Sequence, residues 1–212
     1  MAGNKTAELV KQWADFEQTH PEASIEDFCR YHLISTREKQ NRDGFLGGNV
    51  PPGRDQALLK LMGRVVSMFV IFAEHGLKDI GIDQFVEFTY LNAIRNMKMP
   101  KKTAVINDNF MELSSGLLMI DRMKKKGWVV EHSDKTDKRS KLLELSPEGI
   151  IVLYNCYMKL EKMCAIFFKE LPAEDVNLCV QLLTPVEIQQ SKHWQKNKAT
   201  GFKELLAGNK SE

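Results

Sequence analysis

The chain has 212 residues, of which 43% are hydrophobic and 27% charged, and its formal net charge is +2 at pH 7. This length fits one domain with or without an arm, and the composition is ordinary for a soluble globular protein. No apolar run approaches the roughly 20 residues that span a membrane, and the N-terminus lacks the apolar core of a signal peptide. We therefore expect a cytoplasmic protein with no membrane partner.

The cysteines and histidines argue against a metal or disulfide scaffold. The four cysteines are scattered without a C-x-x-C pair, and the five histidines lie far apart in the sequence. Buried free thiols are the expectation, with no metal site and no cofactor. Nucleophile elbows, phosphate loops, H-E-x-x-H motifs and dinucleotide fingerprints are also missing from the sequence, so we do not expect an enzyme.

The N-terminal part of the chain predicts a helical arm. Apolar residues recur at amphipathic spacing over residues 6–18, and a variant capping box of Ser24 and Asp27 begins a second helix. A stretch rich in glycine and proline follows and predicts a flexible linker. The expected organisation is an arm (1–43), a linker (44–55), a main domain (56–190) and a C-terminal tail (191–212).

Two segments of the main domain predict long helices. Residues 56–75 and 148–190 are apolar on more than one face, and such helices must be buried in a core or against another subunit. In the second segment, one helix should run from Pro147 to Glu170. The next should cover Ala173 to Leu183, and Thr184-Pro185 should bend or restart the chain.

Residues 83–147, between these segments, predict a helix-turn-helix followed by a β-hairpin. Asp83 should cap a helix that ends near Met99-Pro100, a short helix should cover Lys101 to Asn107, and the next should begin near Glu112. Leu113, Leu117, Ile120 and Lys124 share one helical stripe with Met123 beside it, and Gly127 supplies the left-handed residue that ends the helix. Trp128 to Val130 and Leu142 to Leu145 should form the two strands, around a polar turn at Asp134 to Lys138. Ser146 caps the following helix, with Pro147 at its first position.

Positive charge is concentrated on this same part of the chain. Between Lys98 and Lys141 there are eleven basic and six acidic residues, a local net charge of +5, so the remainder carries −3. Such an asymmetry is what binding a polyanion through one face requires. A solvated charge run is the alternative interpretation, because lysines are also common at helix C-termini.

The residues of this segment resemble a known family. Ile120 to Val129 (IDRMKKKGWV), Asp137 to Leu142 (DKRSKL) and Leu145 to Gly149 (LSPEG) resemble the recognition-helix end, the wing and the wing-to-helix junction of multiple-antibiotic-resistance-regulator (MarR) family transcriptional regulators. The resemblance covers about Gln56 to Ile188. It implies a mainly α winged helix-turn-helix fold, with long dimerisation helices and a two-stranded wing. It also implies a homodimer that binds a pseudo-palindromic DNA operator, with repression relieved by a small molecule, an oxidant or a metal.

Candidate DNA-contacting residues follow from the resemblance and from local chemistry. The N-terminus of the second helix, with its serines, can hold a phosphate, and the wing arginine matches the family's minor-groove arginine. The candidates are Lys101, Lys102, Thr103, Ser114, Ser115, Gly116, Met119, Arg122, Lys135, Asp137, Lys138, Arg139 and Lys141. Asp137 would orient Arg139, while Lys135, Lys138 and Lys141 would contact phosphates.

The middle of the presumed recognition helix departs from the family pattern. Leu118 and Met119 replace polar or basic residues, and they cannot both be buried if Ile120 is. One of them could touch thymine methyl groups or pack on the arm. The alternative function is therefore a winged-helix module that binds another protein through this surface, with weak or no sequence-specific DNA binding.

The resemblance also places an effector site at the junction of the dimer helices and the winged domain. The aromatic candidates for lining it are Trp13, Phe69, Phe72, Tyr90 and Tyr154. Neither the effector nor the operator sequence follows from any residue pattern in the chain.

Overall fold

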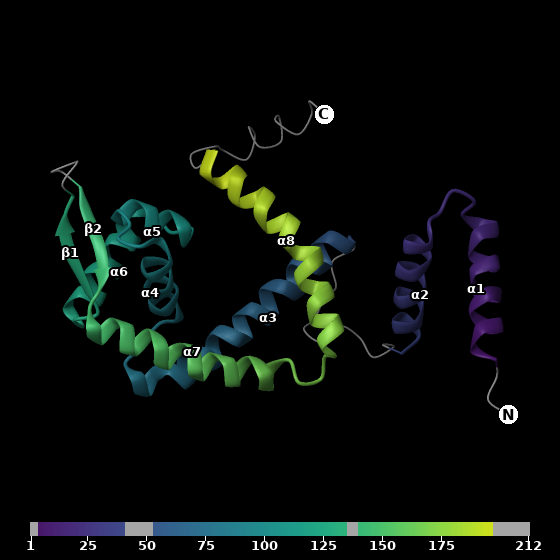
Figure 1. Cartoon of the computed structure of the whole chain (residues 1–212), viewed down its shortest axis with the longest axis horizontal. Coiled ribbons are helices and arrows are strands. Elements are labelled where there is room, and N and C mark those ends of the chain that lie inside the picture. The colour runs from purple at the N-terminus through teal and green to yellow at the C-terminus, as the bar shows by residue number, and fades with distance from the viewer. Residues whose placement is uncertain (1–3, 41–52, 135–139, 197–212) are drawn as a thin grey trace. The chain divides into compact units, whose positions relative to one another are not determined.

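The computed structural model describes residues 4–40, 53–134 and 140–196. Its contacts divide the chain into two compact units, residues 1–60 and 61–212, and the boundary falls inside one long helix. In the described ranges the chain is mainly helical, with one two-stranded antiparallel sheet (Figure 1). The expected fold class, a mainly α winged helix-turn-helix, is confirmed.

The first unit contains a hairpin of α1 (Lys5–Thr19) and α2 (Ile25–Gln40). The Ser24 hydroxyl accepts from the Asp27 backbone N–H at 3.2 Å and the Asp27 carboxylate accepts from the Ser24 N–H at 2.9 Å, so the predicted capping box is present. Phe16 and Phe28 are buried between the helices. Several apolar side chains remain exposed, among them Leu9, Val10, Ile25, Leu33 and Ile34.

The second unit takes in most of α3 (Arg54–Leu77) and continues into the 3-10 turn η1 (Lys78–Ile80). Together they contain an 18-residue window of mean hydropathy 1.6, only 6% of it buried, which is long and apolar enough to cross a membrane by length and composition. Charged residues such as Arg64 interrupt this window, so it is apolar on average but is not an uninterrupted apolar run. Core helices of soluble proteins meet the same criterion.

The winged core follows α3. It is built from α4 (Phe85–Met97), α5 (Lys102–Asp108), α6 (Leu113–Lys125), β1 (Val129–Ser133) and β2 (Lys141–Leu145). The strands pair antiparallel, Val129 opposite Leu145 and Ser133 opposite Lys141. The extended chain before α5 also pairs with β2, since the Leu143 N–H donates to the Pro100 carbonyl at 2.9 Å. This third pairing was not predicted.

Helix boundaries in the winged core depend on local residues. Gly127 adopts a φ of +78°, the left-handed conformation that ends α6, as predicted. The N-cap of α4 is Gln84, so the prediction of Asp83 as the cap is wrong. The Glu87 carboxylate reaches back from the first turn instead and accepts from the backbone N–H of Asp83 at 2.8 Å.

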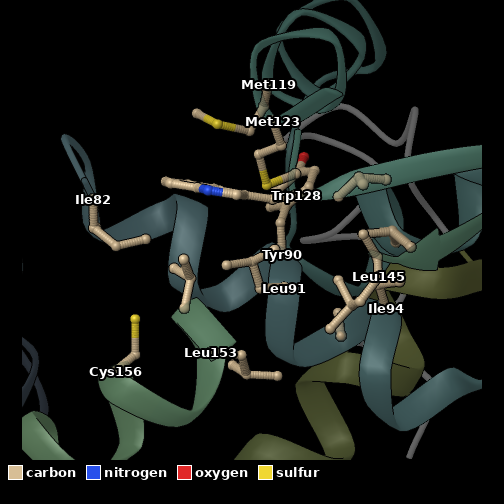
Figure 2. Close-up of a cluster of buried hydrophobic side chains, with 14 of the residues drawn as sticks. Ile82, Tyr90, Leu91, Ile94, Met119, Met123, Trp128, Leu145, Leu153 and Cys156 are labelled. Atoms are coloured by element: carbon tan, nitrogen blue, oxygen red, sulfur yellow. The ribbon is translucent and has the colours of Figure 1, made fainter. Parts of the chain in front are cut away.

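The hydrophobic core lies where α4, α6, the sheet and α7 (Pro147–Phe167) meet. Figure 2 shows Tyr90 of α4 pointing toward Met123 and Trp128, with Leu153 and Cys156 contributed by α7. A Cβ at Gly149 would lie 2.1 Å from the Trp128 carbonyl oxygen, so only glycine permits the first turn of α7 to approach the chain that enters β1. The wing and α7 are thus packed together directly.

The C-terminal helices depart from prediction in their lengths. Ser146 caps α7 as predicted, with its hydroxyl accepting from the Gly149 N–H at 3.0 Å, but α7 ends at Phe167 and not Glu170. Helix α8 (Ala173–Lys196) continues through Pro185, so the predicted end at Leu183 is wrong and α8 extends into the predicted tail. Much of this helix is exposed, so water can solvate the carbonyl that Pro185 leaves without a donor.

Lys159, in the middle of α7, joins this helix to the end of α3. Its ammonium donates to the Gly76 carbonyl at 3.0 Å and to both carboxylate oxygens of Asp79, at 2.6 and 2.7 Å. The contact with Lys159 holds the pKa of Asp79 below its usual value. The prediction of buried thiols holds only for Cys156, and the other three cysteines are exposed.

Candidate nucleic-acid interface

Helices α5 and α6 form the helix-turn-helix, and Gly116 sets how closely they cross. A Cβ at Gly116 would lie 2.6 to 2.9 Å from three side-chain atoms of Ile106 in α5. Gly116 is accordingly buried, and its backbone N–H donates to the Glu112 carbonyl inside the helix. The prediction that Gly116 contacts DNA is therefore wrong, because this position faces α5.

The polar residues at the start of the two helices are accessible. Ser114 and Ser115 lie exposed in the first turn of α6, whose N-cap is Glu112, and Thr103 is exposed on α5. Free backbone N–H groups and hydroxyls at a helix N-terminus suit a phosphate oxygen. The structure therefore leaves these three predicted residues available to a polyanion.

The buried face of α6 is rotated relative to the predicted stripe. Gly116, Met119, Ile120 and Met123 are buried, whereas Leu113 is exposed. Met119 packs into the core, so it cannot touch base edges, and its predicted role in DNA contact is wrong. Leu118 takes the outward position, with 72% of its surface exposed.

The C-terminal end of α6 is held by ionic contacts to the start of α4. The Lys126 ammonium donates to Glu87 Oε1 at 2.8 Å, to Asp83 Oδ2 at 2.7 Å and to the Gly81 carbonyl at 2.8 Å, and it lies 4.6 Å from the centre of the Trp128 ring. Lys126 also holds the pKa of Asp83 below its usual value.

A second contact to the same region comes from Arg122, which donates to the Gln84 side chain at 2.9 Å. Arg122 is a predicted DNA contact, and its side chain is exposed but already engaged within the protein. Together with Lys126 it fixes the presumed recognition helix against α4.

Two lysines of the helix-turn-helix converge on one carboxylate of the wing. Lys102 Nζ of α5 lies 2.6 Å from Glu131 Oε1, and Lys124 Nζ of α6 lies 2.7 Å from the same atom. Burial, the largest influence, raises the pKa of Glu131, but the two ammonium groups outweigh it and the pKa is lowered. The pKa of Lys124 is raised, chiefly by its contact with Glu131.

The described residues of the wing carry further polar pairs. Lys141 donates to the Ser133 hydroxyl at 3.0 Å, and His132 Nε2 lies 2.8 Å from Glu144 Oε2. Lys101, just before α5, lies 3.8 Å from the largely buried Asp134. The remaining predicted wing contacts, Lys135, Asp137, Lys138 and Arg139, lie outside the described residues.

The predicted effector residues that belong to the second unit do not form one cluster. Phe69 and Phe72 both contact Phe167 of α7, at ring-centroid distances of 5.5 and 6.3 Å. Tyr90 is completely buried in the winged core, while Tyr154 is exposed. Trp13 belongs to the first unit and packs edge-on against Phe28 at 5.1 Å. A surface groove of about 430 Å³ beside Phe69 is lined by Val70, Glu74, Gln84, Phe85, Val86 and Thr89.

Glu131 is the residue of the candidate interface that sequence reasoning missed, although a signal for it was present. Alternation along β1 puts Glu131 on the same face as buried Val129, and a carboxylate there requires cationic partners. Across residues 4–40, 53–134 and 140–196, no group of three histidine, cysteine or acidic side chains could hold a metal ion.

Sequence comparison finds no matching protein-family model and no matching curated protein. Solved structures do match. A mutant of MarR from E. coli in complex with operator DNA is 24% identical over 61% of this chain and 92% of that one, with a TM-score of 0.57. This chain has the MarR fold. BpsR of Bordetella bronchiseptica, a protein whose DNA binding is regulated by 6-hydroxynicotinic acid, is 19% identical over 61% and 98% of the two chains, with a TM-score of 0.56.

Another MarR-fold match is PcaV of Streptomyces coelicolor in complex with its natural ligand. It is 17% identical over 68% of this chain and 97% of that one, with a TM-score of 0.56. These matches cover nearly the whole length of the solved chains but leave about a third of the present chain unmatched. The sequence-based resemblance to MarR regulators is therefore confirmed at the level of the fold.

Proposed function

We propose that this protein is a ligand-responsive transcriptional repressor that binds duplex DNA as a homodimer, on a pseudo-palindromic operator in the cytoplasm. One observation carries the proposal: the chain reproduces nearly all of a MarR structure that was solved on operator DNA. The accessible hydroxyls at the start of α5 and α6 support it. So does the local net charge of +5 between Lys98 and Lys141.

In the proposed complex, α6 lies in the major groove and the wing approaches the adjacent minor groove. Ser114 and Ser115 contact a phosphate at the N-terminus of α6, with Thr103 beside them on α5. Arg139 enters the minor groove, where a narrow groove concentrates negative potential. Leu118, the exposed apolar residue of α6, contacts thymine methyl groups.

The proposed homodimer would cover the exposed apolar faces of the long helices. On α3, Leu59, Val66 and Phe72 each have more than half of their surface exposed, and α7 and α8 carry further exposed aliphatic residues. Apolar faces of this extent in a soluble protein mark an interaction surface. A second copy of the chain would bury the exposed apolar surface of α3, so this surface would not require a membrane.

The DNA-binding proposal is tested by fluorescence anisotropy with duplexes from the protein's own promoter region. Affinity should fall steeply as salt rises, because each phosphate contact releases counterions. Arg139→Ala should weaken binding by about 1 to 3 kcal/mol if the side chain enters a groove. Lys169→Ala, after the end of α7, removes the same charge away from the winged core and should bind like the wild type.

The dimer is tested by sedimentation equilibrium. Val66→Glu puts a charge on the exposed apolar face of α3 and should shift the protein to monomer. Ser67→Glu puts the same charge on the neighbouring exposed polar position and should leave the dimer intact. A wild-type protein that is monomeric at micromolar concentration would remove the two-fold arrangement from the proposal.

A second candidate function is favoured by Leu118. Its exposure, together with that of Leu113, gives α6 an apolar outer surface suited to a protein partner, and several nearby lysines are already paired with acids. Two results together would favour this interaction module over the regulator. The protein would not bind duplex DNA even at low salt, and it would bind a defined protein partner that the Leu118→Ser variant no longer binds.

A further inference from the structure

The contact between Glu131 and two lysines bears on how the helix-turn-helix engages phosphate. Both ammonium groups lie within 2.7 Å of one atom, Glu131 Oε1, and that atom is shielded from solvent. The three side chains come from three elements, α5, α6 and β1. Two cations converging on one oxygen form the kind of site that holds a phosphate oxygen.

The burial of the three groups makes this pairing stronger than an ordinary surface ion pair. Exposed fractions are 25% for the Lys102 side chain, 33% for Lys124 and 19% for Glu131. Solvent screens such charges less than it screens fully exposed ones. Glu131 thus neutralises cations on both helices of the helix-turn-helix.

We propose that Glu131 is an internal competitor for DNA phosphate. Its carboxylate occupies the anion site formed by Lys102 and Lys124, and these lysines exchange it for a phosphate oxygen when duplex DNA binds. No covalent step is involved, and the exchange replaces one oxyanion by another at the same two ammonium groups. This inference rests on the proposed DNA-binding function and adds a residue that lowers affinity.

The competing interpretation is that Glu131 positions the lysines for DNA, and the two have opposite consequences. Glu131→Gln keeps the shape of the side chain and removes its charge. A competitor, once neutralised, frees two cations, so affinity for duplex DNA should rise and its salt dependence should steepen. A positioning residue, once neutralised, loosens the lysines, so affinity should fall.

The size of the expected effect follows from counterion release. In the wild type the displaced carboxylate stays near the phosphate and offsets one of the two cations, so Glu131→Gln gains about one net cation and the slope of log K against log salt changes by about −0.9. Between 50 and 200 mM salt the Glu131→Gln variant should therefore lose about threefold more affinity than the wild type loses, starting from tighter binding at 50 mM. Adding Lys102→Gln and Lys124→Gln to Glu131→Gln should abolish this difference.

The matched control is Glu144→Gln. Glu144 lies on β2 and pairs with His132, so this substitution removes the same charge from the wing without freeing a lysine of α5 or α6. Its affinity and salt slope should stay close to those of the wild type. An equal gain in both variants would mean that only the net charge matters, and would overturn the proposal.

A readout without DNA separates this inference from the proposed function. Sodium tripolyphosphate at millimolar concentration should raise the melting temperature of Glu131→Gln more than that of the wild type or of Glu144→Gln. If no variant binds duplex DNA, the regulator proposal fails, and the tripolyphosphate shift alone decides whether Lys102 and Lys124 form an anion site. No difference in that shift, or weaker DNA binding by a folded Glu131→Gln variant, overturns the inference. If the Glu131→Gln variant does not unfold cooperatively, Glu131→Asp replaces it in the same assays. Glu131→Asp shortens the side chain by one methylene and withdraws the carboxylate from the two lysines, so a smaller gain in DNA affinity is expected.

Discussion

Replacing Lys126 by methionine should destabilise the protein strongly, although Lys126 is a lysine at the end of a charged run. Glu87, its partner, is completely buried, while the Lys126 side chain is 22% exposed. Methionine keeps the length of the side chain and its packing against Trp128, so the substitution removes mainly the charge and its hydrogen bonds.

The magnitude follows from what the substitution leaves behind. Removing one partner of a fully buried ion pair costs about 3 to 5 kcal/mol, because the other charge stays buried without compensation. Here water can reach the Lys126 side, and Glu87 Oε2 keeps its backbone donor at Asp83. We therefore expect a loss of about 2 to 4 kcal/mol, a large part of the stability of an ordinary domain.

Urea unfolding followed by tryptophan fluorescence measures this loss. Lys125→Met is the control, since Lys125 is the exposed neighbour and should change stability by less than about 0.5 kcal/mol. Adding Glu87→Gln to Lys126→Met removes the buried charge and should recover part of the loss, giving a coupling energy of about 1 to 3 kcal/mol. If Lys126→Met is no less stable than Lys125→Met, the assignment of Lys126 as the partner of a buried carboxylate is refuted.

Three further predictions concern packing and titration. Gly116→Ala should destabilise the protein by about 1 to 3 kcal/mol, because its methyl group would meet Ile106, whereas Ser115→Ala at the next, exposed position should be near neutral in the same urea assay. Burial raises the pKa of Tyr90 from 10.0 to about 12, so the wild type should be fully stable below pH 10 and lose stability as the pH rises toward 12. Tyr90→Phe removes a buried hydroxyl that has no hydrogen-bond partner, so this variant should be at least as stable as the wild type at neutral pH and should lack the alkaline loss. If the stability of the wild type follows that of the variant above pH 10, the burial of Tyr90 is contradicted. Burial raises the pKa of the Cys156 thiol to about 11. A thiol reagent should therefore modify the three exposed cysteines quickly and Cys156 only on unfolding. Rapid modification of all four cysteines in the folded protein would contradict this prediction.

Features that local sequence controls could be predicted. Gly127 ends α6 because its conformation favours glycine, and Ser146 caps α7 because its hydroxyl reaches the Gly149 N–H two residues after Pro147. In both cases the residues that decide the structure lie within one helical turn of each other. The same holds for the capping box at the start of α2.

Features that depend on the partner element could not be predicted. Periodicity identified α6 as amphipathic, but only the position of α5 and Ile106 shows that Gly116 and Met119 face inward. Lysines in the basic segment were predicted to face DNA, whereas Lys102 is paired with Glu131, which lies 29 positions later in the chain. A count of charges gives their sum over a segment, and their pairing depends on the fold.

The contact of Lys159 with Gly76 and Asp79 has a consequence for how motion would travel through a dimer. It ties α7 to the end of α3, while the first turn of α7 is packed against Trp128 at the start of the wing. In the proposed homodimer, α7 would therefore link the end of α3 to the wing, and a tilt of α3 at the subunit interface would move the wing with it. With two copies related by a two-fold axis, a small change of angle between the α3 helices would change the separation of the two proposed DNA-binding surfaces.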